Sequence, residues 1–96
     1  MSYVITQYTK DKAKQLNLIV KPSTLKNKKI DVFDKSGNKL ASIGALGMND
    51  YPTYIKTKGK AYADERRRLY LIRHAKEPKM KNSKRTPSYY ADVLLW

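Results

Sequence analysis

Positive charge is the feature that most constrains this chain. Its 96 residues carry 21 Lys and Arg against 8 Asp and Glu, a formal net charge of +13 at pH 7. Self-repulsion on this scale opposes compaction, so a stable fold has to keep most cations at the surface, where counterions or an acidic partner neutralise them. Apolar residues make up 41% of the chain, which is enough for one modest core and therefore for a single domain over residues 1–96.

The charge is concentrated in two blocks. Residues 10–29 hold seven lysines against one aspartate, a net +6, and residues 56–87 hold twelve basic side chains against three acidic ones, a net +9. Residues 30–55 between them are close to neutral at −1, and the last nine residues contribute only Asp92. We therefore expect a near-neutral structural centre with a basic segment on either side, each available to a partner.

The neutral centre predicts an antiparallel β-hairpin. Residues 30–33 and 40–43 are rich in β-formers, and the segment from Asp34 to Lys39 between them is rich in turn residues. Residues 17–21, which end just before a proline, are a third candidate strand, and residues 3–5 are a fourth. The sheet is therefore expected to be small and built around this hairpin.

Two segments beside the hairpin are less regular. Residues 9–16 fit either a short helix capped by Thr9 or a strand-loop-strand segment. Residues 45–52 contain Gly47 and an Asn-Asp pair and are expected to form a loop. Their spacing matches no phosphate-binding fingerprint, so plain turn chemistry explains them. Residues 1–58 as a whole are expected to be mainly β-structure and loops.

The second half predicts one long basic amphipathic helix over residues 59–77. It should run from about Lys60 to Lys76, after Gly59 and before Pro78. Asp64 and Glu65 lie in its first turn, where the helix dipole favours acidic side chains, and each has an arginine three residues later, so both are interpreted as structural. One broad apolar face, expected to be buried, consists of Tyr62, Leu69, Ile72 and Ala75.

A basic linker and an aromatic tail are expected to complete the chain. Seven of the residues in segment 78–86, residues 79–85, carry four positive charges and no acidic side chain. The segment should therefore form an extended linker. Residues 87–96 predict a short helix capped by Thr86, with Pro87 in its first turn. This C-terminal anchor either completes the chain's own core or inserts into a neighbour. The predicted fold class is α+β: a small antiparallel hairpin-based sheet, one long basic helix and a short aromatic C-terminal helix.

Residues suited to catalysis are scarce. The sequence has no cysteine and His74 is its one histidine, which excludes disulfides, thiol nucleophiles and cysteine zinc sites. Asp64 and Glu65 are adjacent on the predicted helix and diverge, so they cannot act as paired carboxylates. We expect no catalytic residue, no metal site and no cofactor, hence a binding protein and not an enzyme. A small nuclease that uses Arg66 with Glu65 or Glu77 and a metal is the enzymatic alternative.

Basic and aromatic side chains together suit a polyanion, because phosphates contact cations and unpaired bases stack on rings. The sequence contains no nucleic-acid-binding motif, so binding without sequence readout is expected. The candidate polyanion-binding residues are Arg66, Arg67, Arg68, Arg73, Lys76, Lys79, Lys81, Lys84 and Arg85. The candidate stacking or anchor residues are Tyr51, Tyr54, Tyr89, Tyr90 and Trp96. Exposed stacking is expected of Tyr51, Tyr54 and Tyr8, and packing of Tyr62, Tyr89, Tyr90 and Trp96.

Two strings in the second half point to a viral origin. The strings GKAYADERRRLYLIRH at residues 59–74 and PSYYADVLLW at residues 87–96, with DYPTY at residues 50–54, resemble a family of small uncharacterised basic proteins of large double-stranded DNA viruses, the giant viruses. The resemblance covers about the C-terminal half and carries no activity. It implies a non-enzymatic, virion-associated structural protein, a minor capsid or core component, that binds acidic surfaces of capsid proteins. The alternative is a sequence-nonspecific nucleic-acid-binding protein of such a virus.

The sequence also bears on where the chain works. Its apolar runs fall far short of the roughly 20 residues that span a bilayer, and its N-terminus lacks the pattern of a secretory signal. We therefore expect a protein that is made and kept in the cytosol. The viral resemblance implies the host cytoplasm during assembly and then the virion, where the chain would be part of a large assembly.

Overall fold

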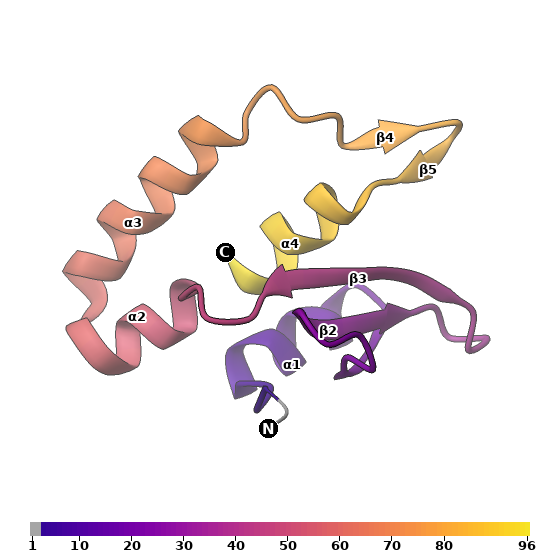
Figure 1. The fold of residues 1–96 in the computed structure, drawn as a ribbon, viewed down its shortest axis with the longest axis horizontal. Coiled ribbons are helices and arrows are strands. Elements are labelled where there is room, and N and C mark those ends of the chain that lie inside the picture. Colours follow the sequence, from indigo (N-terminus) through magenta and orange to yellow (C-terminus); the bar gives the residue numbers. More distant parts are fainter. Residues whose placement is uncertain (1–2) are drawn as a thin grey trace.

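The computed structural model describes residues 3–96, and its fold class is α+β, as predicted. The molecule measures 37 × 31 × 26 Å. A three-stranded sheet with two helices occupies one side and a pair of helices occupies the other (Figure 1). The elements in chain order are α1 (Gln7–Gln15), β1 (Ile19–Pro22), β2 (Lys28–Phe33), β3 (Lys39–Ala45), α2 (Tyr51–Lys58), α3 (Lys60–Arg73), β4 (Met80–Lys81), β5 (Lys84–Arg85) and α4 (Pro87–Leu95).

The predicted hairpin is present as β2 and β3, and β1 completes an antiparallel sheet in the order β1-β2-β3. Ile30 pairs with Ile43 and Val32 with Ala41, which places these four apolar side chains on one face. The turn is held by Asp34, whose Oδ1 accepts hydrogen bonds from the backbone N–H groups of Ser36 and Asn38, both at 2.9 Å. Residues 3–5, the fourth candidate strand, have no strand structure.

The hydrophobic core lies between the apolar face of the sheet and two helices, α1 and α4. Leu94 and Leu95 of α4 are fully buried, and Ala13 of α1 is 2% exposed. The Thr9 hydroxyl donates to the carbonyl oxygen of Leu94 at 2.8 Å, which ties the two helices together. Of the two alternatives for the C-terminal anchor, the structure therefore shows the first: the tail completes the chain's own core.

Residues 7–15 form a helix, so the helical alternative for this segment is correct, but its predicted cap is wrong. Thr6 is the N-cap, and its Oγ1 accepts from the backbone N–H of Thr9 at 3.3 Å. Thr9 itself lies inside the helix and is completely buried. Both threonines suit a cap; the contact between Thr9 and α4, which is distant in sequence, decides which one is used.

Residues 1–58 contain two helices, α1 and α2, beside their strands and loops, and α2 was not predicted. Helix α2 begins with Asp50 as N-cap, whose Oδ1 accepts from the backbone N–H of Thr53 at 3.1 Å. Pro52 occupies the first turn, where a missing N–H costs nothing. The tyrosines of this segment favour a strand. For this reason the signal for a helix start, an acidic cap followed by a proline, was not recognised.

Helix α3 is shorter than predicted and buries a different face. It ends at Arg73, and the residues up to Pro78 form turns. Ala63 and Tyr70 are its buried residues, whereas Tyr62, Leu69 and Ile72 of the predicted buried face are 46%, 37% and 60% exposed. The prediction assumed that the apolar side chains define the contact, but α3 packs through small and aromatic side chains against α2 and the C-terminal residue.

The predicted linker at residues 78–86 is a short β-hairpin. Met80 pairs with Arg85 and Lys81 with Lys84. Asn82 and Ser83 between them both have positive φ, 52° and 65°, as the central residues of a type I′ turn require. The linker prediction was wrong because it weighed only the missing apolar side chains, while backbone pairing and this Asn-Ser turn order the segment.

Gly44 marks the closest approach between β3 and α4. Its φ is 77°, and a Cβ added there would lie 2.9 Å from the Leu95 Cδ1 and from the Lys29 Cδ. We predict that Gly44→Ala lowers the free energy of unfolding by about 2–4 kcal/mol, from backbone strain plus overpacking. Gly37→Ala is the matched control, since Gly37 also has positive φ but an added Cβ would meet nothing within 4 Å. If Gly44→Ala and Gly37→Ala lower the free energy of unfolding in urea equally, β3 and α4 are not closely packed at Gly44.

Asp31, on the opposite face of the sheet, predicts a stability change in acid. Burial alone would raise its pKa, but hydrogen bonds from Ser23, Ser42 and Thr24 and the charge of Lys39 lower it to about 2 from 3.8. Because the folded-state pKa is depressed, the stabilisation is present above about pH 4 and is lost as the pH falls toward 2. We expect the deficit of Asp31→Asn in urea unfolding to be large at pH 6 and to shrink at pH 2. A deficit that is independent of pH would refute this role.

Candidate polyanion-binding cleft

An open cleft of about 630 Å³ lies between α3 and the layer formed by β3 and α4. Arg66, Tyr70 and Arg73, which share one face of α3, line one wall. The segment from Ile43 to Ala45 of β3 and the end of α4 line the other. Gly59, with φ 92°, separates α2 from α3 and turns the chain so that α3 stands over this space. The cleft therefore brings part of the second basic block over the neutral sheet.

The inner end of the cleft is built from aromatic rings. Trp96 stacks on Tyr70 with 4.3 Å between ring centroids and an angle of 10° between planes. Tyr70 also stacks on His74 at 4.2 Å, and Tyr54 lies 6.2 Å from Trp96. Burial, together with the nearby Asp92 carboxylate, raises the pKa of Tyr70 above its ordinary value. These contacts hold α3 in place, because they join it to α2 and to the C-terminus.

Two arginines of α3 lie over tyrosine rings of α2. The Arg66 guanidinium is 5.5 Å from the Tyr54 ring centroid, and that of Arg67 is 5.1 Å from the Tyr51 ring centroid. Such cation–π contacts position a guanidinium without neutralising its charge. The Nε atom of Arg66 is buried and has no hydrogen-bond partner within residues 3–96. Arg66 also lines the cleft and makes no ion pair within the described residues.

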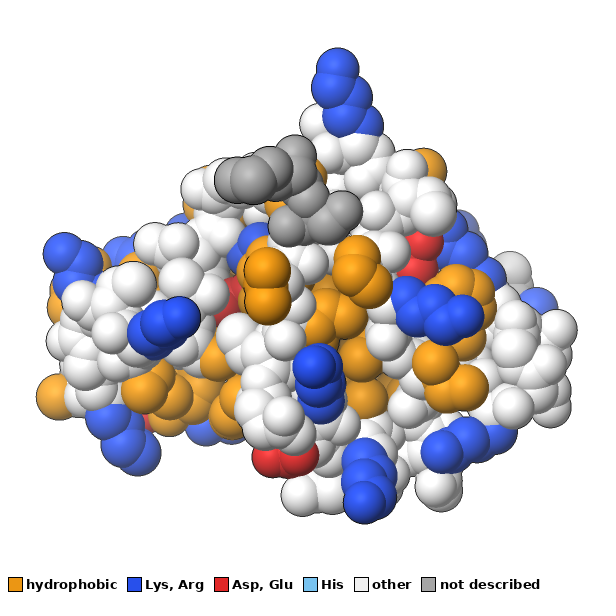
Figure 2. Space-filling model, turned by 90° about the horizontal axis from the view of Figure 1, so that it is seen from below, with side chains coloured by type: hydrophobic (Ala, Val, Ile, Leu, Met, Phe, Trp, Pro, Cys, Tyr) orange, Lys and Arg blue, Asp and Glu red, His pale blue; other side chains and the backbone are white. Residues whose placement is uncertain are grey.

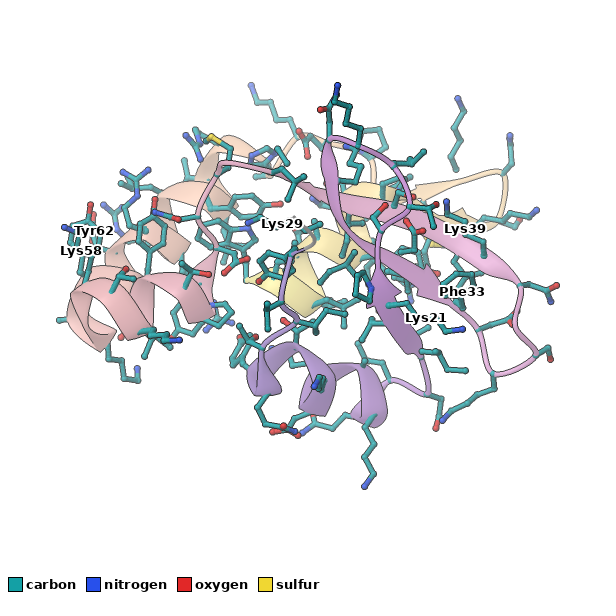
Figure 3. The ribbon with its side chains drawn as sticks, turned by 60° about the horizontal axis from the view of Figure 1, so that its bottom comes forward. Lys21, Lys29, Phe33, Lys39, Lys58 and Tyr62 are labelled. Atoms are coloured by element: carbon teal, nitrogen blue, oxygen red, sulfur yellow. The ribbon has the colours of Figure 1, made fainter. Side chains whose placement is uncertain are left out.

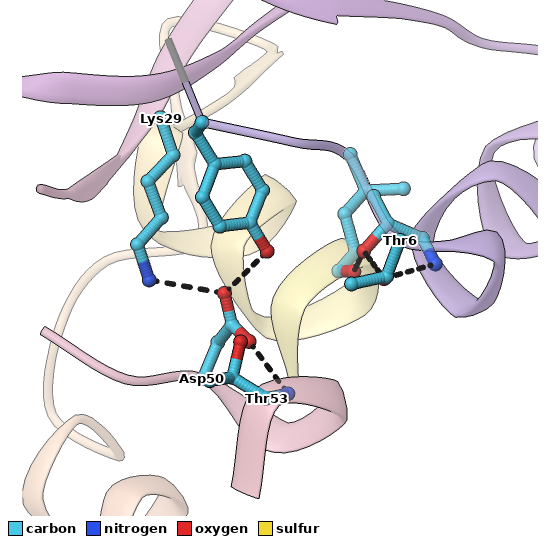
Figure 4. A network of polar contacts seen from close by, with 7 residues as sticks. Thr6, Lys29, Asp50 and Thr53 are labelled. Atoms are coloured by element: carbon cyan, nitrogen blue, oxygen red, sulfur yellow. Dashed lines mark hydrogen bonds and ion pairs between the residues drawn. The ribbon is translucent and has the colours of Figure 1, made fainter. Parts of the chain in front are cut away.

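The floor of the cleft near α2 contains a buried ion pair. Lys29 Nζ lies 3.0 Å from Asp50 Oδ2, and the two side chains are 5% and 2% exposed. The Tyr3 hydroxyl donates to the same oxygen at 2.7 Å, while the other Asp50 oxygen caps α2 (Figure 4). Burial alone would raise the pKa of Asp50, but its contacts with Thr53, Tyr3 and Lys29 hold it below its ordinary value. Lys29 is thus a structural cation.

A polar network at the C-terminal end of α3 includes three residues that line the cleft, His74, Glu77 and Ser88. Lys79 Nζ lies 2.7 Å from Asp92 Oδ2 and donates to the Ser88 hydroxyl at 2.6 Å. Ser88 in turn donates to Glu77, whose other carboxylate oxygen is 2.7 Å from the His74 Nδ1. The network therefore ties the C-terminal end of α3 to α4.

The predicted polyanion-binding residues are divided between the cleft lining and positions outside it. Only Arg66, Arg73 and Lys81 of that set line the cleft, and Lys28, from the first basic block, joins them. Arg68 is paired with Glu65, Lys79 with Asp92, and the Arg85 guanidinium lies 4.2 Å from the Tyr89 ring centroid. The residues of the set that do not line it are Arg67, Arg68, Lys76, Lys79, Lys84 and Arg85. No sequence signal links Lys28 to the others, because only the fold brings the two blocks together.

The predicted stacking residues are also redistributed. Tyr51 is 5% exposed, so its expected exposure is wrong: it packs 5.4 Å from Tyr8, and its hydroxyl donates to Asp64 at 2.6 Å. Asp64 therefore bonds to α2 and to Lys60, and not to Arg67 as predicted. Tyr51 is the first residue of α2, and its side chain is buried there.

Among the remaining aromatic residues, Tyr90 and Trp96 are buried, as predicted, and Tyr54 and Tyr89 are half-buried. Tyr62, which was expected to be packed, is exposed and lies 5.5 Å from the Tyr54 ring. Tyr62 and Lys58 are at one end of the molecule, away from Lys21, Phe33 and Lys39 of the sheet (Figure 3). The exposed Tyr62 ring therefore lies on the α2–α3 pair at this end of the molecule.

Basic side chains are also present elsewhere on the surface. On the face seen in Figure 2, separate Lys and Arg side chains are spread over the surface, and acidic side chains are few. Within the part of the chain that the structure describes, no group of three or more potential metal ligands is found. Likewise, none of the helices in residues 3–96 has the length and apolar character that crossing a membrane requires.

The Lys29–Asp50 pair predicts a large effect of one substitution. Lys29→Met leaves the Asp50 charge buried without its cation, so we expect a loss of roughly 3–5 kcal/mol in the free energy of unfolding. Lys60→Met is the control, because it breaks the exposed Lys60–Asp64 pair, whose side chains are 73% and 48% exposed, and should change little. Chemical denaturation at neutral pH measures both. Similar small effects would show that the buried pair does not hold α2 on the sheet.

No family model, curated protein or solved structure matches this chain. The resemblance to small basic proteins of giant viruses stays a prediction, and the case for a function depends on the geometry of the cleft.

Proposed function

We propose that this protein is a non-enzymatic nucleic-acid-binding protein that contacts phosphates through the cleft and does not read sequence. The observation that carries this proposal is the balance of charge around the cleft. Arg66, Arg73, Lys28 and Lys81 line it, and none of them makes an ion pair within residues 3–96. Of the acidic residues that line it, Asp50 is paired with Lys29, and Glu77 accepts a hydrogen bond from the Ser88 hydroxyl and lies 2.7 Å from the His74 Nδ1.

This arrangement favours a phosphate backbone as the partner. Phosphates release counterions when they bind lysine and arginine, which supplies affinity without base contacts. The guanidinium of Arg66 is held over a tyrosine ring, so less side-chain entropy is lost when it binds an anion. The remaining exposed cations add a diffuse positive field that would steer a polyanion toward the cleft.

A virion-associated structural role, as a minor capsid or core component on acidic capsid surfaces, is the second candidate. One observation favours it: Leu69, Leu71 and Ile72 are 37%, 42% and 60% exposed on α3, and nucleic-acid binding does not require apolar side chains there. The C-terminal aromatics, in contrast, do not support docking into a neighbour, because Tyr90 and Trp96 are buried in the chain's own core. Genome binding inside a virion is compatible with both candidates.

The test is a salt series with labelled DNA and RNA. Arg66→Ala/Arg73→Ala should weaken binding about tenfold or more near physiological salt and reduce the slope of log K against log salt by about 2. Arg68→Ala/Lys58→Ala removes the same charge at two residues that do not line the cleft and should have a much smaller effect. Thermal unfolding of each variant checks its stability.

Two outcomes would overturn the proposal. If the wild-type protein binds no better than a generic cationic peptide, nucleic-acid binding is rejected and the protein-facing role remains. If both double variants lose the same affinity, binding reflects net charge alone and the cleft has no part in it.

A further inference from the structure

We infer that the cleft holds a single strand, with unpaired bases against its apolar wall and phosphates on its cationic rim. This inference rests on the proposed function and narrows its ligand. Nucleic acid could be bound as a duplex on the outer surface or as a single strand in the cleft. Three features of the cleft distinguish these ligands.

The first feature is size. A cavity of about 630 Å³ lies within the roughly 300–1,000 Å³ of sites that enclose small molecules. A few nucleotides of one strand match this volume. A double helix, whose major groove alone is about 12 Å wide, would stay outside and touch only the rim. If the cleft is used, the strand inside it is therefore single.

The second feature is the chemistry of the wall opposite α3. It is formed mainly by apolar side chains, among them Ala45, Met48, Ala91 and Leu95, and Trp96 lies at its inner end. Met48 is 62% exposed, so this surface is accessible. A phosphate backbone gains nothing from apolar contact, whereas an unpaired base exposes an apolar face that a duplex keeps stacked inside. The wall therefore matches bases and the rim matches phosphates.

The third feature is the placement of the cations. Arg66 and Arg73 are two helical turns apart on one face of α3, roughly 10.5 Å along its axis. They therefore reach different phosphates of one strand. Lys28 and Lys81 line the cleft from a strand of the sheet and from the β4–β5 hairpin. The Arg66 guanidinium, which lies over the Tyr54 ring and makes no ion pair within the described chain, would contact a phosphate.

The experiment compares three polyanions on the full chain: an oligothymidylate of about 20 nucleotides, a DNA duplex of the same length, and heparin. We expect the oligothymidylate to bind about tenfold more tightly than the duplex at equal salt. Trp96 is the one tryptophan of the sequence and lines the cleft, so its fluorescence reports occupancy directly. It should change with the oligothymidylate and stay unchanged with heparin and with the duplex.

A pair of variants locates the strand. Ala45→Glu places a carboxylate on the cleft wall and should weaken oligothymidylate binding about tenfold. Gln15→Glu removes the same net charge at the exposed end of α1, away from the cleft, and should leave binding within about twofold. Because Ala45→Glu alters β3, circular dichroism checks its folding. The Trp96 signal of the wild-type protein tests the inference without any variant.

Each outcome has one meaning. Equal binding of single strand and duplex, with no change in Trp96 fluorescence, would overturn the single-strand inference and leave the proposed nucleic-acid binding intact. Binding of heparin with the same fluorescence change would also overturn it, since heparin has no bases. Failure of every nucleic acid to bind would reject the inference together with the proposed function.

Discussion

The buried ion pair between Lys29 and Asp50 is the interaction on which the arrangement of this protein depends. Asp50 binds the β2 lysine and the Tyr3 hydroxyl through one oxygen and caps α2 through the other. Two charges removed from water are stable only when both are satisfied, so the pair fixes where α2 begins relative to the sheet. Since α3 follows α2 after a single glycine, the position of α3 follows too. The cleft is the space that remains between α3 and the sheet.

A chain with this much positive charge has few acidic groups to distribute, and three of them lie in the interior or at joints between elements. Asp31 accepts hydrogen bonds behind the sheet, Asp50 joins sheet and helix, and Asp92 holds Lys79 at the end of the cleft. Aromatic rings also position cations, because a guanidinium or ammonium group over a ring is held in place while it keeps its charge. The cations left over are the ones that a partner can reach, and some of them gather around the cleft.

The fold was predictable where local signals agree with burial. Alternation and turn residues predicted the β2–β3 hairpin, and a threonine followed by proline predicted α4. Helix α2 was missed because its tyrosines resemble a strand, and the β4–β5 hairpin was missed because its pairing depends on backbone and turn geometry. For the site, Arg66 and Arg73 were identified in advance as basic residues of one helix. The sequence did not show that Arg68 and Lys79 differ from these two arginines. In the fold, Arg68 is paired with Glu65 and Lys79 with Asp92, and composition does not specify these neighbours.

The sequence by itself determined that this is one small α+β domain with a large excess of positive charge and no thiol chemistry, because these properties follow from length, periodicity and residue counts. Only the tertiary structure decided which cations are free. A lysine in a charge block becomes structural, as Lys29 and Lys79 do, when a carboxylate from a distant segment meets it in the fold. It stays available to a partner, as Lys28 does at the cleft, when the fold places no carboxylate next to it. That choice is set by contacts between segments far apart in the chain, and charge counted along the sequence carries no information about them.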